Sequence, residues 1–168
     1  MFSRTENFQQ YIKFYPVVST IIALNVIIHV LTMVPVLGDL IFNYGAGANY
    51  LISDGQWWRF ITPMFLHSGF LHLLFNMFSL YLFGPELEKL AGKLRFLNIY
   101  FMAGLFGTVA TFLLQDASYV HVGASGAIYG LLGAFGALVY YARKTLPQLR
   151  QIILPIIVIS IIMTFLTP

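Results

Sequence analysis

A serine lies among small residues at the start of a long apolar stretch, in the run HVGASGAIYG at positions 121–130. A serine hydroxyl is a poor nucleophile until a base accepts its proton, and the tetrahedral intermediate of acyl transfer needs hydrogen-bond donors for its oxyanion. Gly123, Ala124 and Gly126 would let substrate and backbone come close to Ser125. Taken alone, Ser125 is better explained as a structural residue, because membrane helices use glycine, alanine and serine where they touch and a serine there can bond to its own helix backbone.

A second apolar stretch carries His72 and Asn76, which are four residues apart. On a helix they share one face, about 6 Å apart along the axis. Polar side chains within a membrane helix are costly and usually face the bundle interior or a water-filled cavity. The amide of Asn76, the ring of His72 and the backbone N–H of Ser125 are donors of the kind that binds an oxyanion. Hydrogen bonding to neighbouring helices is the alternative role for this pair.

The depth of these residues in a membrane is predicted to be similar. Ser125 comes 18 residues before Arg143, so a helix would put it roughly 27 Å from that charge. Asn76 would lie about 20 Å from Lys89, and His72 about 6 Å farther. All three are expected in the outer half of the bilayer, where they could meet.

The composition is that of an integral membrane protein. Hydrophobic residues make up 59% of the 168 residues and charged residues 9%, whereas about a quarter of the residues in soluble domains are charged. The apolar residues gather into five segments of membrane-spanning length, approximately 17–37, 65–84, 94–114, 122–142 and 151–167. Nothing alternates as transmembrane β-strands would. We therefore predict an all-α, polytopic transmembrane bundle that forms a single domain over residues 1–168.

Charge predicts the orientation of this bundle, since Lys and Arg concentrate in cytoplasmic loops. Eight of the nine basic residues fall on one side of the five segments: Arg4, Lys13, Lys89, Lys93, Arg95, Arg143, Lys144 and Arg150. We expect a multi-pass protein of the cell membrane with a cytoplasmic N-terminus. The net charge of +3 is thus explained by topology and gives no reason to expect nucleic acid. There is no cysteine, which excludes disulfides and thiolate nucleophiles.

Two further features concern packing and the longest loop. The loop from about 38 to 66 is rich in aromatic residues, which favour the headgroup region, so it is expected to lie partly in the outer leaflet. Glycines recur on the third and fourth segments, at Gly104, Gly107, Gly126, Gly130, Gly133 and Gly136. They permit close approach of helices and predict that the fourth segment lies at the centre of the bundle.

Taken together, the motifs resemble the rhomboid family of intramembrane serine proteases. The resemblance runs from about Trp57 to the fourth helix and rests on Trp58-Arg59, His67, His72-x-x-x-Asn76, Glu88-Lys89, Gly123-Ala124-Ser125-Gly126 and Tyr129. It implies that Ser125 is the nucleophile and that Asn76, His72 and the Ser125 N–H form the oxyanion hole. It also implies supporting roles: Gly123 and Gly126 flank the serine, Tyr129 packs against the catalytic histidine, Trp58-Arg59 belongs to the membrane-embedded first loop, and Glu88 is structural.

The sequence departs from the family in one respect, which is the base. Rhomboids use a Ser–His dyad whose histidine comes from a sixth helix, and this chain has five of the six expected helices. His29 lies mid-helix, the spacing of His67 turns it off the face of His72, and a dyad made by His121 within one loop has no counterpart in the family. We therefore expect a chain truncated at its C-terminus, or one that lost its last helix, and catalytically crippled as it stands.

The leading hypothesis is an intramembrane serine endopeptidase that cleaves single-span membrane proteins near the external face. The expected partners are a transmembrane protein substrate and the lipid bilayer, with no metal or organic cofactor. One alternative is a non-catalytic rhomboid-like protein that binds membrane clients. A small transporter or channel is disfavoured, because no charged residue lies in a predicted span beyond Arg95 at the start of 94–114. The substrate, the pathway and the oligomeric state are left open.

Overall fold

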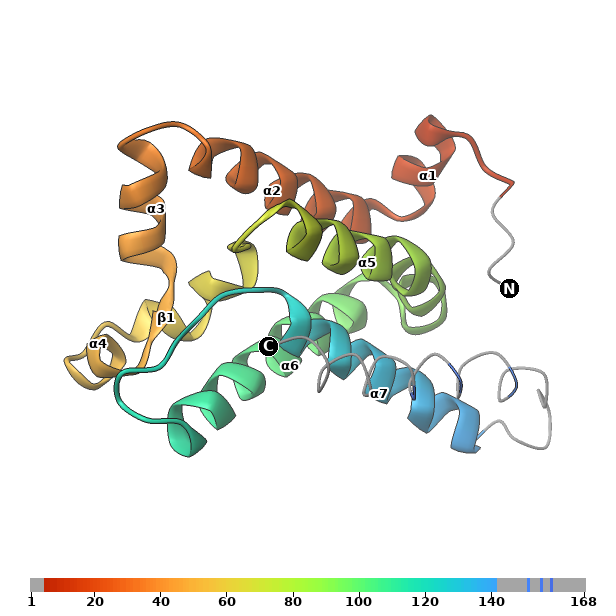
Figure 1. Ribbon diagram of the computed structural model, residues 1–168. Helices are drawn as coiled ribbons and strands as arrows, with labels where there is room; N and C mark the ends of the chain where they lie inside the picture. The colour runs from red at the N-terminus through yellow and green to blue at the C-terminus, as the bar shows by residue number, and fades with distance from the viewer. Residues whose placement is uncertain (1–4, 142–150, 152–154, 156–157, 159–168) are drawn as a thin grey trace.

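The computed structural model describes residues 5–141 and the isolated residues 151, 155 and 158. Helices dominate this part of the chain (Figure 1), which confirms the all-α prediction. In chain order, the elements are α1 (Phe8–Phe14), α2 (Pro16–Thr32), α3 (Leu37–Gly45), β1 (Gly47–Ala48), α4 (Asn49–Ser53), the 3-10 helices η1 (Trp57–Phe60) and η2 (Thr62–Phe65), α5 (Phe70–Ala91), α6 (Lys93–Leu114), β2 (Val120–His121) and α7 (Ser125–Tyr141).

The membrane-spanning helices match the predicted segments unequally. Helices α5 and α6 are each long and apolar enough to cross a membrane, and α1 and α2 pass the same test as a pair bent by 112°. The described part of α7 contains a shorter apolar stretch, Ser125–Leu138. The predicted fifth segment, 151–167, lies almost entirely outside the described residues.

Two predicted boundaries were wrong, and proline explains one of them. The segment 17–37 ends as helix α2 at Thr32, because Pro35 cannot continue a helix and restricts the residue before it. The segment 65–84 was placed too early: α5 begins at Phe70 and runs through Pro85 to Ala91. The last turn of α5 therefore includes Glu88, whose role is described below.

The N-terminal bend is built by local residues. A capping box starts α1, in which Asn7 and Gln10 exchange side chain to backbone hydrogen bonds of 2.9 Å. Pro16 occupies the first position of α2. Proline suits that position because its missing N–H has no partner to lose there. The chain can therefore turn sharply between α1 and α2.

Helix α7 packs against α6 (Figure 1), and small residues form the contact. A Cβ atom built on Gly126 would lie 3.6 Å from Cα of Gly107 and 3.9 Å from Cα of Gly104, and one on Gly130 would overlap Cβ of Ala103. Gly133, in contrast, faces open space. The predicted close approach is thus confirmed, but Gly133 takes no part in it.

The core lies between α2, α5, α6 and α7. Its largest fully buried side chains include Phe96 and Tyr100 of α6, Phe135 and Leu131 of α7, and Leu80 of α5. Two helices also approach closely at Gly84 of α5, where the side chain of Val18 of α2 fills the space that a Cβ would need. These contacts hold α5 and α7 in place, and the N-terminal turns of these two helices carry His72, Asn76 and Ser125.

The first loop is folded rather than irregular, and it is tied to the loop before α7. Strand β1 pairs with β2 in antiparallel fashion, with Gly47 opposite His121 and Ala48 opposite Val120. The pairing continues into α4, where the backbone N–H of Asn49 donates to the carbonyl of Tyr119 at 3.1 Å. The first loop therefore helps to determine where α7 begins.

Candidate active site

Ser125 is the first residue of α7, and the backbone before it is held in place. Gly123 has φ +125°, a conformation that favours glycine. Its N–H donates to the carbonyl of Pro63 in η2 at 2.8 Å. Backbone N–H groups in the first turn of a helix have no partner within that helix and carry partial positive charge. The N–H of Ser125 belongs to this group, and the residue as a whole is exposed.

His72 lies in the first turn of α5, and its ring reaches the same glycine. A Cβ atom built on Gly123 would lie 2.7 Å from Nε2 of His72 and 3.8 Å from Oγ of Ser125. Nε2 of His72 and Oγ of Ser125 can therefore be no farther apart than the sum of these two distances. A side chain at position 123 would have to displace the ring. Gly123 thus leaves open the space that the ring of His72 and the hydroxyl of Ser125 both border.

Asn76 lies one turn farther along α5 and is buried. Its Nδ2 donates a hydrogen bond of 2.8 Å to the backbone carbonyl of His72. A side-chain amide has two N–H donors, so this bond commits one and leaves the other for a second acceptor. Asn76 can therefore bond to its own helix and still donate a hydrogen bond within the site.

His67 is in contact with His72, which the sequence interpretation did not expect. Spacing along a helix would have turned it away, but α5 begins only at Phe70, so helical spacing does not apply. The rings of His67 and His72 pack edge to face with centroids 5.1 Å apart. Burial lowers the pKa of His67 to about 4, helped by the neighbouring rings of His72 and His29 and opposed by the backbone of Phe65. His67 is thus a neutral packing partner of His72.

The other two histidines lie on other elements, α2 and β2. His29 is buried in α2. His121 lies in β2, where its ring stacks on Tyr119 with centroids 6.1 Å apart. Its Nε2 would lie 2.6 Å from a Cβ built on Gly47 of the first loop, and burial lowers its pKa.

Arg59 organises the first loop from inside it. Its side chain is only 2% exposed, and its guanidinium donates to the carbonyls of Ala46 and Asn43 at 2.6 Å each and to Oε1 of Gln56 at 2.8 Å. A planar guanidinium can serve several acceptors at once because its donors are fixed in a fork. Arg59 therefore connects the end of α3 to η1.

Trp58 contributes to the same loop from its surface. Its Nε1 donates to the carbonyl of Tyr44 at 3.0 Å, while about half of the side chain, 49%, is exposed. Thr62, which sequence reasoning missed, donates to the carbonyl of Gly45 at 2.7 Å. No sequence signal distinguished this threonine from the others, since its role depends on a partner 17 residues away.

Comparison with known proteins shows the family to which the chain belongs. The Rhomboid domain model matches residues 54–168. The chain belongs to the rhomboid family. It is 40% identical over 168 residues to the putative rhomboid protease YdcA of Bacillus subtilis (strain 168), a match that covers 99% of this chain and 84% of the relative. It is 45% identical over 119 residues to Rhomboid protease GluP of the same organism, covering 71% of this chain and 23% of the relative.

A plant member of the family also matches part of this rhomboid. RHOMBOID-like protein 5 of Arabidopsis thaliana is 44% identical over 91 residues, which cover 54% of this chain and 29% of the relative. The chain thus spans most of the length of the first relative but less than a third of the other two. Several of the relatives are named as proteases.

Glu88 has a structural role in this rhomboid, at the far end of α5 from His72. Its two carboxylate oxygens accept hydrogen bonds from the backbone N–H groups of Val17 at 3.2 Å and Val18 at 2.9 Å. The residue before α2, Tyr15, provides no side-chain cap. A buried carboxylate from another helix therefore satisfies the N-terminus of α2, where negative charge is also favoured by the helix dipole.

Tyr129 lies one turn after Ser125 on α7, and its side chain is 38% exposed. Packing of Tyr129 against a catalytic histidine, as the family resemblance implies, remains a prediction.

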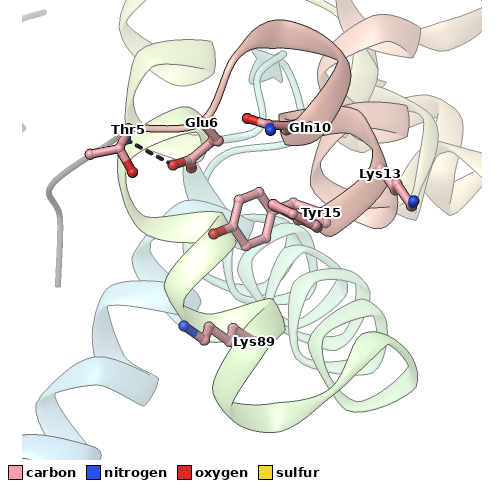
Figure 2. A pocket seen from close by; sticks show the side chains of 7 residues that line it. Thr5, Glu6, Gln10, Lys13, Tyr15 and Lys89 are labelled. Carbon is pink, nitrogen blue, oxygen red and sulfur yellow. Dashed lines mark hydrogen bonds between the residues drawn. The ribbon is translucent and has the colours of Figure 1, made fainter.

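A hollow of about 780 Å³ lies at the opposite end of α5 from His72, between α1 and the end of α5 (Figure 2). It is lined by Thr5, Glu6, Gln10, Lys13, Phe14, Tyr15 and Lys89. Lys13 and Lys89 thus share one end of the bundle, as the charge pattern predicts for two residues on the same side of a membrane. The hollow contains no residue of the Ser125 site.

Proposed function

We propose that this rhomboid is an intramembrane serine endopeptidase with Ser125 as its nucleophile. The observation that carries the proposal is that Nε2 of His72 and Oγ of Ser125 both border Gly123, at the open N-terminus of α7. Serine-based acyl transfer needs a hydroxyl beside donors for the oxyanion. The names of the relatives support a protease of this family.

The oxyanion of the tetrahedral intermediate is bound by three groups in this proposal. The backbone N–H of Ser125 supplies one donor at the helix N-terminus, where the dipole also favours negative charge. Nε2–H of His72 supplies the second. The N–H of Asn76 that does not bond to the carbonyl of His72 supplies the third. Gly123 leaves room for the carbonyl oxygen of the substrate between them.

The proton of Ser125 needs an acceptor other than these donors. His29 is buried in α2, His67 packs its ring against His72 and His121 stacks on Tyr119, while His72 must keep its Nε2 proton to bind the oxyanion. We therefore assign the base to a histidine from outside these 168 residues. It takes the proton from Oγ as the serine attacks the carbonyl and returns it to the leaving amine. A water molecule then hydrolyses the acyl-enzyme with help from the same base.

The substrate in this proposal is a membrane protein with a single transmembrane helix, cut near the external face. The positive charges favour a protein of the cell membrane with a cytoplasmic N-terminus, which puts Ser125 toward the outside. A helical substrate must unwind locally to present its peptide bond, so residues with weak helix propensity are expected near the cleaved bond. No metal or organic cofactor has a step in this chemistry, and water enters from the outside.

A cleavage assay with the protein expressed from its native gene tests the proposal. The probe is a reporter with one transmembrane helix that carries glycine and other helix-weak residues near its outer end. The native protein should cut it, and Ser125→Ala should not. The matched control is Ser79→Ala, since Ser79 lies on α5 and donates only to the carbonyl of Phe75. Equal cleavage by native protein and Ser125→Ala, or no cleavage of a panel of such reporters by the native protein, would overturn the assignment.

A further inference from the structure

A second serine contacts the ring of His72 from the side away from Ser125. Oγ of Ser68 lies 3.1 Å from Nδ1 of His72, four residues farther along the chain. Nε2 and Cε1 of the same ring border Gly123. The two nitrogens of His72 thus have different neighbours: a hydroxyl at Nδ1, and the space beside Ser125 at Nε2.

The start of α5 explains why the hydroxyl of Ser68 is available for the ring. The N-cap residue of α5 is Gly69, which has no side chain to cap the helix. A serine at the N-cap itself would commonly accept a hydrogen bond from a backbone N–H in the first turn. Ser68 stands one residue earlier, and its hydrogen bond goes to the side chain of His72 in the first turn of the helix.

We propose that Ser68 is a positioning residue that fixes the tautomer of His72. This inference rests on the proposed protease function, in which Nε2 of His72 donates to the oxyanion. A neutral imidazole carries one proton, on either nitrogen. A serine hydroxyl can donate to Nδ1 or accept a hydrogen bond from it; in this proposal it donates, so that Nδ1 is the acceptor and the proton resides on Nε2. The ring is then prepared as a donor before substrate arrives, which is the condition for efficient stabilisation of an oxyanion.

The other close ring does not perform this function. His67 packs against His72 with an interplanar angle of 71°. Such a contact restricts the plane of the ring, but it does not distinguish Nδ1 from Nε2. Ring orientation and tautomer are thus set by two different neighbours, His67 and Ser68. The partner at one imidazole nitrogen decides the protonation of the other, as it does for histidines in many active sites.

The first test measures the tautomer directly and needs no activity. The full-length native protein is labelled with ¹⁵N in its histidine rings, and the spectra are recorded at a pH of about 8, where an ordinary histidine is neutral. His72→Gln identifies the signals that belong to His72. The native ring should show one tautomer with the proton on Nε2. Ser68→Ala should show a mixture of both tautomers, while Ser68→Thr, which keeps a hydroxyl, and Ser79→Ala should resemble the native protein.

The second test measures cleavage of the single-span reporter by the same variants. Ser68→Ala should lower kcat about threefold to tenfold, the value of one hydrogen bond, with little change in KM, and Ser68→Thr should restore kcat. An unchanged His72 tautomer in Ser68→Ala, or a native ring protonated on Nδ1, would overturn the inference whatever the kinetics. If the tautomer shifts but no form of the protein cleaves any reporter, the proposed protease function fails while the link from Ser68 to His72 stands.

Discussion

The carboxylate of Glu88 near the end of α5 accepts a hydrogen bond of 2.9 Å from the backbone N–H of Val18 at the start of α2. The same carboxylate accepts a second bond from Val17. Glu88 is 3% exposed, so these bonds form where water cannot replace them. A single side chain therefore joins two membrane helices and satisfies the N-terminus of one of them.

Replacing Glu88 by alanine should destabilise the fold by about 2 kcal/mol, because two backbone N–H groups lose a charged acceptor. Glu88→Gln should lose less, since its one remaining oxygen can still accept. The measurement is the midpoint of thermal unfolding in a mild detergent. The control is Asp54→Asn, which removes a carboxylate from an exposed turn after α4. Equal midpoints for Glu88→Ala and the control would contradict the capping role.

The contact between α6 and α7 predicts opposite effects for two glycines on the same helix. Gly130→Ala would overlap Cβ of Ala103 and force the helices apart, which typically costs about 1–3 kcal/mol. Gly133→Ala meets nothing within 4 Å and should gain up to about 1 kcal/mol from the higher helix propensity of alanine. Unfolding midpoints of the two variants check this. A stabilised Gly130→Ala would show that the helices do not meet there.

The burial of His67 predicts a loss of stability in acid. Its pKa is lowered from 6.5 to about 4 in the folded protein, so between these values the unfolded chain binds a proton that the folded one does not. Stability is therefore fully present above pH 6.5 and falls as the pH drops toward 4. The loss from this group is at most about 3 kcal/mol.

His67→Gln separates this effect from other titrations. His121 is also shifted downward by burial and contributes in the same direction, so the variant should retain part of the loss. The measurement is the unfolding midpoint at a series of pH values from neutral to acid. If His67→Gln and the native protein lose stability in parallel over the whole range, His67 is not the group that titrates.

The sequence predicted those parts of the fold that depend on local pattern. Apolar length located α5 and α6, and the repeated small residues identified the contact of Gly104 and Gly107 with Gly126. The four-residue spacing put His72 and Asn76 near each other, and in the structure the amide of Asn76 donates to the carbonyl of His72. Each of these features follows from helix geometry within one segment or from residue size alone.

The features that the sequence did not reveal depend on contacts between distant segments. The pairing of Gly47 with His121 and the three acceptors of Arg59 belong to a loop whose pattern predicted only a place near the headgroups. His67 was misjudged because helix α5 begins three residues after it. The start of a helix is decided by tertiary contacts as much as by local sequence, and a shift of a few residues changed the expected neighbours of that ring.

Asn76→Ala should separate a catalytic effect from a structural one. If the second amide proton of Asn76 binds the oxyanion, its loss should lower kcat by about 10²–10³ with little change in KM, as for other oxyanion donors. The structural cost should be only about 1 kcal/mol, for the lost bond to the carbonyl of His72. Thr108→Val is the matched control, because Thr108 is a buried residue that donates to the carbonyl of Gly104, four residues earlier, outside the site. The stability of the two variants should fall by similar amounts, while kcat for cleavage of the single-span reporter should fall only in Asn76→Ala. A native kcat for Asn76→Ala would restrict Asn76 to its local bond and leave the oxyanion to His72 and the N–H of Ser125.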